Sequence, residues 1–352
     1  MRGIVAQPPG RAGCYDPRMA FPAAALSGID PPAVLPGARL WLRGDGVPAV
    51  DAPQAGVTVG GLPARIVFCA PDRAAVEIPV SAAGGRAAVR AAWWPGATPF
   101  VDVGETIATG IHAVDSPVVD AAGRVYCAYS GSRGQETPVS VYRIGADGGR
   151  EPFVEGIVNP TGLAFSPGGV LFVSSRFEGI VYRVQDDGRA EVFASELGVA
   201  CGLAFDAEGA LYVGDRSGTI HRLSPDGAEV RTFATLPPSV AAYHLAFGPD
   251  GHLYATGPTM STADAVYRFD EAGRPEVIDA TFGRPQGLAF DPHGVLHVVE
   301  ALAGASAIYR LPAGAPRQMV VAGPGLVGLA FLPGGGLIAA TSDALYRFAA
   351  IP

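Results

Sequence analysis

Hydrophobic positions recur along the chain with a period of about forty residues from residue 118 onward. The recurring stretch is Gly-Leu-Ala-Phe, best preserved at residues 162–165. Its leucine is repeated at spacings of 40, 42, 43 and 41 residues, at Leu163, Leu203, Leu245, Leu288 and Leu329. A degenerate copy begins at Pro117, and its Val118 lies 45 residues before the first of these leucines. A repeat of this length with several short apolar runs predicts a β-propeller.

Each repeat has the same internal order of turns and strands. A glycine such as Gly169 follows the phenylalanine by four residues and supplies the positive φ that a hairpin turn needs. A second apolar strand comes next, and an aromatic-arginine pair marks a third strand in every repeat. These pairs begin at Tyr142, Tyr182, His221, Tyr267, Tyr309 and Tyr346. Six pairs predict an all-β, six-bladed β-propeller over residues 98–352.

The last repeat stops at Phe348, before a fourth strand. Residues 98–102, Thr-Pro-Phe-Val-Asp, resemble the fourth strand of the first repeat, Glu-Pro-Phe-Val-Glu at residues 151–155. We therefore expect residues 98–103 to pair with the last blade, because this would cover its open edge and close the ring.

Residues 27–92 lack the repeat and form a separate predicted domain. Short runs such as 64–68 and 75–79 alternate apolar and polar residues, which predicts a small immunoglobulin-like β-sandwich. Residues 1–26 are expected to be a flexible N-terminal segment. Residues 93–97, which contain Trp93 and Trp94, are expected to link the two domains.

Composition narrows the classes of partner. The formal net charge is −8, which argues against nucleic acid or an anionic membrane surface as the main partner. All 25 basic residues are arginine, a usage typical of a GC-rich bacterial genome. No signal peptide or membrane-spanning stretch is evident, so a cytoplasmic location is the default expectation. The four cysteines have no CxxC spacing, which disfavours a disulfide framework or structural zinc.

Ligand-binding side chains of a propeller are expected at one mouth of its central channel. The loops that precede the first strand of each repeat and those that follow the second strand should share one face. Arg176 and Arg216 each lie 13 residues after a repeat leucine, and Arg133 occupies the equivalent loop of the first repeat. Three neighbouring guanidinium groups would suit a carboxylate or phosphate. The alternative is that each arginine pairs with a local acid, Glu136, Glu178 or Asp215.

The same face should carry further polar side chains near the axis. They are Asp115, Asn159, Cys201, Tyr243, His244, Gln286 and, in the loops after the second strand, Asp215 and Glu300. Asp115 and His244 are the candidate catalytic residues, and the others are candidate ligand contacts, with core-lining roles as the alternative. The other histidines fall on strands or on turns of the opposite face and are expected to be structural.

Three family resemblances follow from these motifs. Residues 160–169, Pro-Thr-Gly-Leu-Ala-Phe-Ser-Pro-Gly-Gly, and residues 284–294 resemble NHL repeats and the six-bladed gluconolactonase/regucalcin superfamily. That superfamily implies hydrolysis of sugar lactones by a divalent metal held at the channel mouth. Asp115, in Asp-Ser-Pro-Val, matches the first metal-ligand position, where the family has Glu. Residues 29–32, 36–46 and 76–79 resemble the IPT/TIG family, which implies a spacer or protein-interaction domain.

The positions that precede the later strands depart from the superfamily pattern, because Cys201, Tyr243 and Gln286 stand where Asn or Asp is expected. Three hypotheses follow. The first is a non-catalytic propeller that binds a small anionic molecule or a peptide, with a protein partner for the IPT/TIG domain. The alternative is a hydrolase of lactones or esters that depends on Ca, Mg, Mn or Zn. The third is a protein-interaction scaffold.

Overall fold

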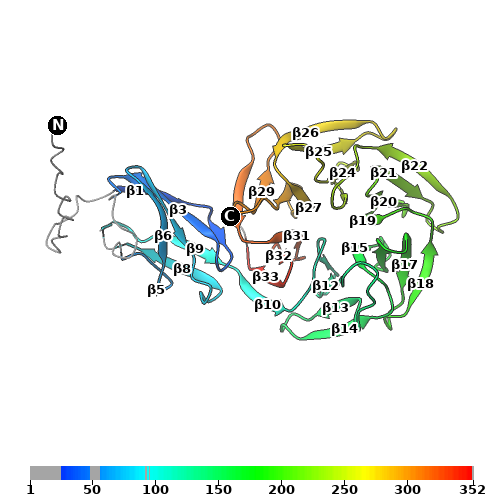
Figure 1. Cartoon of the computed structure of the whole chain (residues 1–352), viewed down its shortest axis with the longest axis horizontal. Coiled ribbons are helices and arrows are strands. Elements are labelled where there is room, and N and C mark those ends of the chain that lie inside the picture. The colour runs from blue at the N-terminus through cyan, green and yellow to red at the C-terminus, as the bar shows by residue number, and fades with distance from the viewer. Residues whose placement is uncertain (1–24, 48–55, 92, 95, 351–352) are drawn as a thin grey trace, which may run out of the picture.

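The computed structural model describes residues 25–47, 56–91, 93–94 and 96–350, and all of its regular elements are β-strands. Most of the segment expected to be flexible, residues 1–24, lies outside the described residues. Two bodies are joined edge to edge: an N-terminal unit and a ring of sheets arranged like a propeller (Figure 1). The described part of the chain contains no helix that could span a membrane.

The ring consists of consecutive up-and-down sheets whose first strand lies nearest the axis (Figure 1). The first is β11 (Val118–Val119), β12 (Val125–Ala128), β13 (Val141–Ile144) and β14 (Arg150–Val154). The second is β15 (Pro160–Phe165), β16 (Leu171–Ser175), β17 (Ile180–Val184) and β18 (Ala190–Ala194). The third is β19 (Ala200–Phe205), β20 (Leu211–Asp215), β21 (Thr219–Leu223) and β22 (Val230–Thr235).

The remaining sheets continue the same order. The fourth is β23 (His244–Phe247), β24 (Leu253–Thr256), β25 (Asp264–Phe269) and β26 (Pro275–Phe282). Next come β27 (Pro285–Phe290), β28 (Leu296–Glu300), β29 (Ala307–Leu311) and β30 (Gln318–Ala322). The last group is β31 (Leu326–Phe331), β32 (Leu337–Thr341) and β33 (Ala344–Phe348), with β10 (Glu105–Thr109) beside β33.

Hydrophobic cores lie between neighbouring sheets and continue around the ring. Tyr126 of the first sheet packs in one cluster with Leu163 of the second. Val125 of the first sheet shares a cluster with Ile338 and Leu345 of the last. The first and last sheets are therefore neighbours, as a closed ring requires.

The closing strand differs from the sequence-based expectation. Residues 98–103 do not pair with the last sheet; β9 (Phe100–Val103) pairs with β8 (Gly85–Arg90) and β2 (Ala33–Val34) instead. The next strand, β10, pairs antiparallel with β33. Both edges of β9 are occupied by N-terminal strands, so the short turn at Gly104 brings the following segment to the open edge.

The N-terminal unit has two layers around one core. One layer is β1 (Ala25–Asp30), β3 (Arg39–Asp45), β7 (Arg73–Glu77) and β6 (Arg65–Ala70). The other contains β2, β9, β8, β4 (Thr58–Val59) and β5 (Leu62–Pro63). Leu40 of the first layer and Val89 of the second lie in the same cluster, and both are fully buried.

This unit is not separated from the ring by a free linker. β2 pairs in parallel with β30 on one side and with β9 on the other, so one sheet of nine strands runs from the ring into the N-terminal unit. Trp93, expected in a linker at residues 93–97, is buried in the core of the N-terminal unit. Strand β1 also begins at Ala25, two residues before the expected domain boundary.

The inner strands approach one another so closely that only glycine fits at several positions. A Cβ on Gly202 would lie 2.3 Å from the carbonyl oxygen of Tyr243 on the neighbouring strand. Gly202→Ala is therefore expected to force β19 and β23 apart and to lower the free energy of unfolding by about 3 kcal/mol. Urea unfolding measures this, with Gly334→Ala as the control, because a Cβ on exposed Gly334 meets no atom within 4 Å. Equal stability of the two variants would contradict the close approach.

His297 occupies a position that is Phe or Tyr in four other sheets, such as Phe172 and Tyr212. It is buried against Phe331, and burial lowers the pKa of its imidazole. Below about pH 6.5 the His297 imidazole is protonated in the unfolded chain but stays neutral in the folded chain. Acid should therefore destabilise the folded protein. His297→Phe should reduce the loss of stability between about pH 7.5 and 5.5 by up to about 1 kcal/mol. Urea unfolding at both pH values tests this, and an unchanged loss would contradict it.

Candidate functional site

Asp115 and His244 meet across the central channel. Asp115 lies just before β11, whose inner-strand neighbours are β15 and β31, whereas His244 begins β23, whose neighbours are β19 and β27. The two strands therefore lie on opposite sides of the ring. Even so, His244 Nδ1 is 2.5 Å from Asp115 Oδ1.

Both members of this pair are buried and held in place. His244 is 3% exposed and Asp115 is 7% exposed. The backbone N–H of Ser116 donates to the same Asp115 oxygen at 2.6 Å. The structure thus brings together the two candidate catalytic residues, which are 129 positions apart in the sequence.

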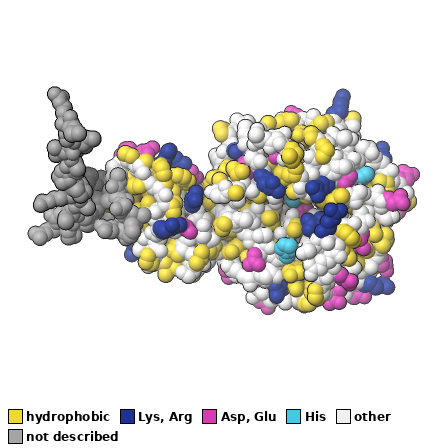
Figure 2. Space-filling view, viewed as in Figure 1, with side chains coloured by type: hydrophobic (Ala, Val, Ile, Leu, Met, Phe, Trp, Pro, Cys, Tyr) yellow, Lys and Arg dark blue, Asp and Glu magenta, His cyan; other side chains and the backbone are white. Residues whose placement is uncertain are grey.

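The three candidate arginines bind no carboxylate. Arg176 Nη2 donates to Ser130 Oγ at 3.2 Å, and Arg216 Nε donates to the Ser239 carbonyl at 3.3 Å. Arg133 is exposed. Among the described residues none of the three forms an ion pair. Figure 2 shows arginine side chains gathered near the middle of the disc.

Two of the three local acids that could have neutralised these arginines are engaged elsewhere, and Glu136 forms no ion pair among the described residues. Asp215 accepts the backbone N–H groups of Val199, at 2.8 Å, and Ser217, at 3.2 Å. Glu178 accepts the Tyr182 hydroxyl at 3.0 Å. The alternative of local arginine–acid pairs is therefore not what the structure shows, and Asp215 fixes a loop.

Cys201 is buried in β19, and its thiol donates to the Val199 carbonyl at 3.2 Å. Burial is the main reason that its thiol pKa is raised to about 12. The Asp115 carboxylate raises this pKa further, while Arg176 and Arg216 lower it. The Asp115 carboxylate and the two arginines are therefore all close enough to Cys201 to act on its thiol. The thiol itself stays protonated and is a poor nucleophile.

Asn159 positions the loop that carries Arg133. Its amide donates to the carbonyls of Gly131, at 2.8 Å, and Ser132, at 2.9 Å, and its carbonyl oxygen accepts the Gly134 N–H at 2.6 Å. Asn159 has a φ of 48°, a conformation that Asn tolerates better than most residues. It is fully used in this structural role.

Of the other candidates, some hold loops in place and one remains available to a ligand. Tyr243 is fully buried and donates its hydroxyl to the Pro237 carbonyl, and burial raises the pKa of its phenol. Glu300 accepts the Gly283 N–H at 2.6 Å. Gln286 is half-buried at the start of β27. Tyr243 and Glu300 therefore fix loops, while Gln286 is free to contact a ligand.

The metal site implied by the superfamily resemblance does not fit these residues. The Asp115 oxygen already accepts from His244 and Ser116, and the Asn159 amide is committed to its loop. Calcium and magnesium need several oxygen ligands, which Cys201 cannot supply. Within the described ranges, no group of three His, Cys, Asp or Glu side chains could hold a metal ion.

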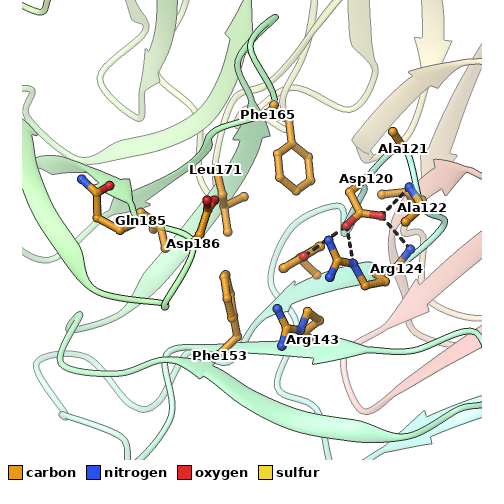
Figure 3. A pocket seen from close by; sticks show the side chains of 14 residues that line it. Asp120, Ala121, Ala122, Arg124, Arg143, Phe153, Phe165, Leu171, Gln185 and Asp186 are labelled. Atoms are coloured by element: carbon orange, nitrogen blue, oxygen red, sulfur yellow. Dashed lines mark hydrogen bonds and ion pairs between the residues drawn. The ribbon is translucent and has the colours of Figure 1, made fainter.

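A hollow at the opposite face is repeated around the ring. It has a volume of about 600 Å³ between the first two sheets and is lined by Asp120, Arg124, Arg143 and Phe153 (Figure 3). Both of its arginines are paired: Arg124 Nε lies 2.6 Å from Asp120 Oδ2, and Arg143 Nε lies 2.6 Å from Glu151 Oε1. Similar hollows lie at the next two sheet interfaces. The hollow is thus a consequence of the repeat.

Sequence reasoning missed two features of the mouth. Ser130 is fully buried and receives the Arg176 hydrogen bond. Three exposed apolar side chains lie in loops that follow second strands: Phe177 is 52% exposed, Met260 90% and Leu302 44%. No local motif marks these positions. Only their place in the repeat could have indicated them, because each lies two to four residues after the end of a second strand.

Comparison with solved structures places this fold among proteins with different activities. A gluconolactonase from Xanthomonas campestris is 16% identical with a TM-score of 0.59, covering 86% of this chain and 99% of its own. An auxiliary nutrient binding protein from Bacteroides thetaiotaomicron is 12% identical with a TM-score of 0.55, covering 95% and 99%. A virginiamycin B lyase from Staphylococcus aureus, crystallised with quinupristin, is 13% identical with a TM-score of 0.51, covering 88% and 90%.

At these identities the similarity concerns the fold alone. No curated protein matches the sequence. Residues 113–257, which contain Asp115, Arg176, Arg216 and His244, match the family model described as the SMP-30/Gluconolactonase/LRE-like region. The chain therefore carries a gluconolactonase-like region within an all-β, propeller-like fold.

Proposed function

We propose that this protein binds a small anionic molecule, or a peptide carboxylate, at the channel mouth that carries Arg133, Arg176 and Arg216. The observation that carries the proposal is that these guanidinium groups stand on one face without an acidic partner. The buried Asp115–His244 pair forms the floor of the site. In this proposal the ring is a six-bladed propeller closed by β10.

The arginine side chains suit an anion for electrostatic and geometric reasons. A guanidinium group presents several N–H donors in one plane and can bind both oxygens of a carboxylate or phosphate. The hydrogen bonds of Arg176 to Ser130 and of Arg216 to a carbonyl hold the side chains in place without neutralising them. This reduces the conformational entropy that binding would otherwise cost.

The rim of the mouth favours a ligand with an apolar part. Phe177 directly follows Arg176, and its ring lies over Gly134 in the loop of Arg133. Met260 is almost fully exposed in the equivalent loop of the fourth sheet. A peptide carboxyl terminus or an organic acid would meet both kinds of surface, whereas inorganic phosphate would meet only the arginines.

A thermal-shift screen tests this proposal. A ligand that binds only the folded state raises the melting temperature by mass action. Citrate, hexanoate, a C-terminal peptide and inorganic phosphate should each be titrated in the presence of EDTA, with calcium, magnesium, manganese and zinc titrated separately. We expect carboxylates to raise the melting temperature and metals to leave it unchanged. A shift with a metal, and with none of the anions, would refute the proposal.

The N-terminal unit has a place in the same proposal. We propose that it is an immunoglobulin-like domain of the IPT/TIG type that serves as a spacer and a protein-interaction surface. Phe68 is 43% exposed on β6, an outer strand of its four-stranded layer, which supports a partner at this edge. The continuous sheet through β2 would hold that surface at a fixed orientation to the ring.

A further inference from the structure

The imidazole of His244 has one nitrogen held and one nitrogen free. Nδ1 faces the Asp115 carboxylate at 2.5 Å, so Nδ1 carries the proton and donates. Nε2 has no hydrogen-bond partner among the described residues. Within the described ranges, the fully buried side-chain atoms without a hydrogen-bond partner are Trp93 Nε1, Arg310 Nε and Arg317 Nη1, so His244 Nε2 is not fully buried. The Nε2 edge therefore opens into the channel.

A purely structural role does not require this arrangement. Burying a carboxylate and an imidazole across the axis costs free energy that a pair of aliphatic side chains would avoid. The other deeply buried histidine, His297, shows the structural alternative: its Nδ1 contacts the Val295 carbonyl and its ring packs on Phe331. Of these two histidines, only His244 is oriented by a carboxylate.

None of the side chains around His244 is available as a nucleophile, so the nucleophile in this site would be water. Cys201 is protonated because burial raises its thiol pKa to about 12. The Ser116 hydroxyl accepts the Leu329 N–H at 3.3 Å. The Tyr243 hydroxyl is bound to the Pro237 carbonyl. None of these groups donates its proton to His244.

We propose that His244, oriented by Asp115, is a general base that activates water for hydrolysis of an ester carrying a carboxylate, without a metal ion. This inference rests on the proposed anion site, because Arg176 and Arg216 would hold the carboxylate. Nε2 takes a proton from water while the water oxygen bonds to the ester carbonyl carbon. The tetrahedral intermediate then breaks its C–O bond to the alcohol, and the departing oxygen takes the proton from Nε2. Ester and water become acid and alcohol, with no net redox change.

The first test is the tautomer of His244 in the folded protein. NMR spectra of protein with nitrogen-labelled histidines should show His244 protonated at Nδ1 and unprotonated at Nε2, and the His244→Gln spectrum assigns the signal. Asp115→Asn should abolish this preference, because an amide can also donate to Nδ1. A wild-type His244 with its proton on Nε2 would overturn the proposal.

The second test is turnover of a charged ester and its uncharged analogue. In excess EDTA, mono-p-nitrophenyl adipate should be hydrolysed with a kcat/KM at least about tenfold above that of p-nitrophenyl hexanoate. His244→Gln should lower kcat by about 100-fold or more, and Asp115→Asn should lower kcat with little change in KM. Arg176→Ala with Arg216→Ala should instead raise KM for the adipate ester alone.

The outcomes separate this inference from the proposed function. If His244→Gln keeps the melting temperature of the wild type, the variant is folded and its loss of turnover is chemical. Wild-type protein that binds citrate but shows no His244-dependent hydrolysis would overturn the general base and leave the anion site intact. If citrate does not bind the wild-type protein, both the anion site and the general base that rests on it are wrong.

Discussion

Replacing residues 105–109 with an equal length of Gly and Ser should lower the melting temperature by about 10 °C. These residues form β10, which pairs with β33 and covers the edge of the last sheet. The replacement removes the strand-forming side chains and the contribution of Ile107 to the cluster shared by the first and last sheets. Losing both the pairing and this packing should cost about 4 kcal/mol of unfolding free energy. Calorimetry measures the effect.

Arg347→Ala is the matched control for this replacement. It removes the ion pair between Arg347 and Glu105, 3.0 Å apart, but leaves the strand in place. Because Glu105 is more than half exposed, this pair should contribute less than about 1 kcal/mol. A replacement no more damaging than Arg347→Ala would show that β10 does not hold the ring closed.

The double substitution Arg176→Ala and Arg216→Ala should weaken binding of citrate by at least about 100-fold. Each guanidinium group lost removes a charge-assisted hydrogen bond of about 1.5–3 kcal/mol, and two such losses together exceed a factor of 100. The melting temperature should change little, since neither arginine forms an ion pair. Isothermal titration calorimetry gives the affinity, and the melting curve reports the fold.

A second double variant controls for net charge. Arg183 and Arg231 are exposed on β17 and β22 of the same two sheets, away from the mouth. Arg183→Ala with Arg231→Ala removes the same two charges and should leave the affinity within about twofold, because screened charges act weakly at a distance. If both double variants lose affinity equally, the attraction is diffuse and the arginine site is wrong.

The repeat made most of the sheet order predictable. The recurrence of leucine and of aromatic-arginine pairs located the first and third strands, since both patterns express the contacts between adjacent sheets. Arg176 and Arg216 could be placed in equivalent loops by counting from the same leucine. The closing strand was misplaced by a few residues, because residues 98–103 have the right side-chain pattern and only the tertiary pairing of β9 with β2 and β8 excludes them.

The site was predictable in its position but not in its contacts. Asp115 and His244 were expected at the same mouth, yet nothing local indicates that they touch, because they approach from repeats three apart. The roles of Asn159, Asp215 and Tyr243 also could not be predicted from the sequence. A polar side chain before an inner strand can face the channel or fix a loop, and only its hydrogen bonds decide between these roles.

The continuous sheet between the two units also could not be predicted from the sequence, because its pairing depends on tertiary contacts. β2 has only two residues, Ala33 and Val34, and both of its neighbours are distant in sequence. A two-residue strand leaves no periodic pattern. The boundary drawn at residues 93–97 followed composition, whereas the backbone pairing places β9 with the N-terminal unit.

Isothermal titration of the wild-type protein with citrate, in excess EDTA, tests the central claim most directly. The account predicts saturable binding at one site per chain, weakened by salt and abolished by Arg176→Ala with Arg216→Ala. Absence of citrate binding by the folded wild-type protein, or binding that survives the double substitution unchanged, would contradict the account.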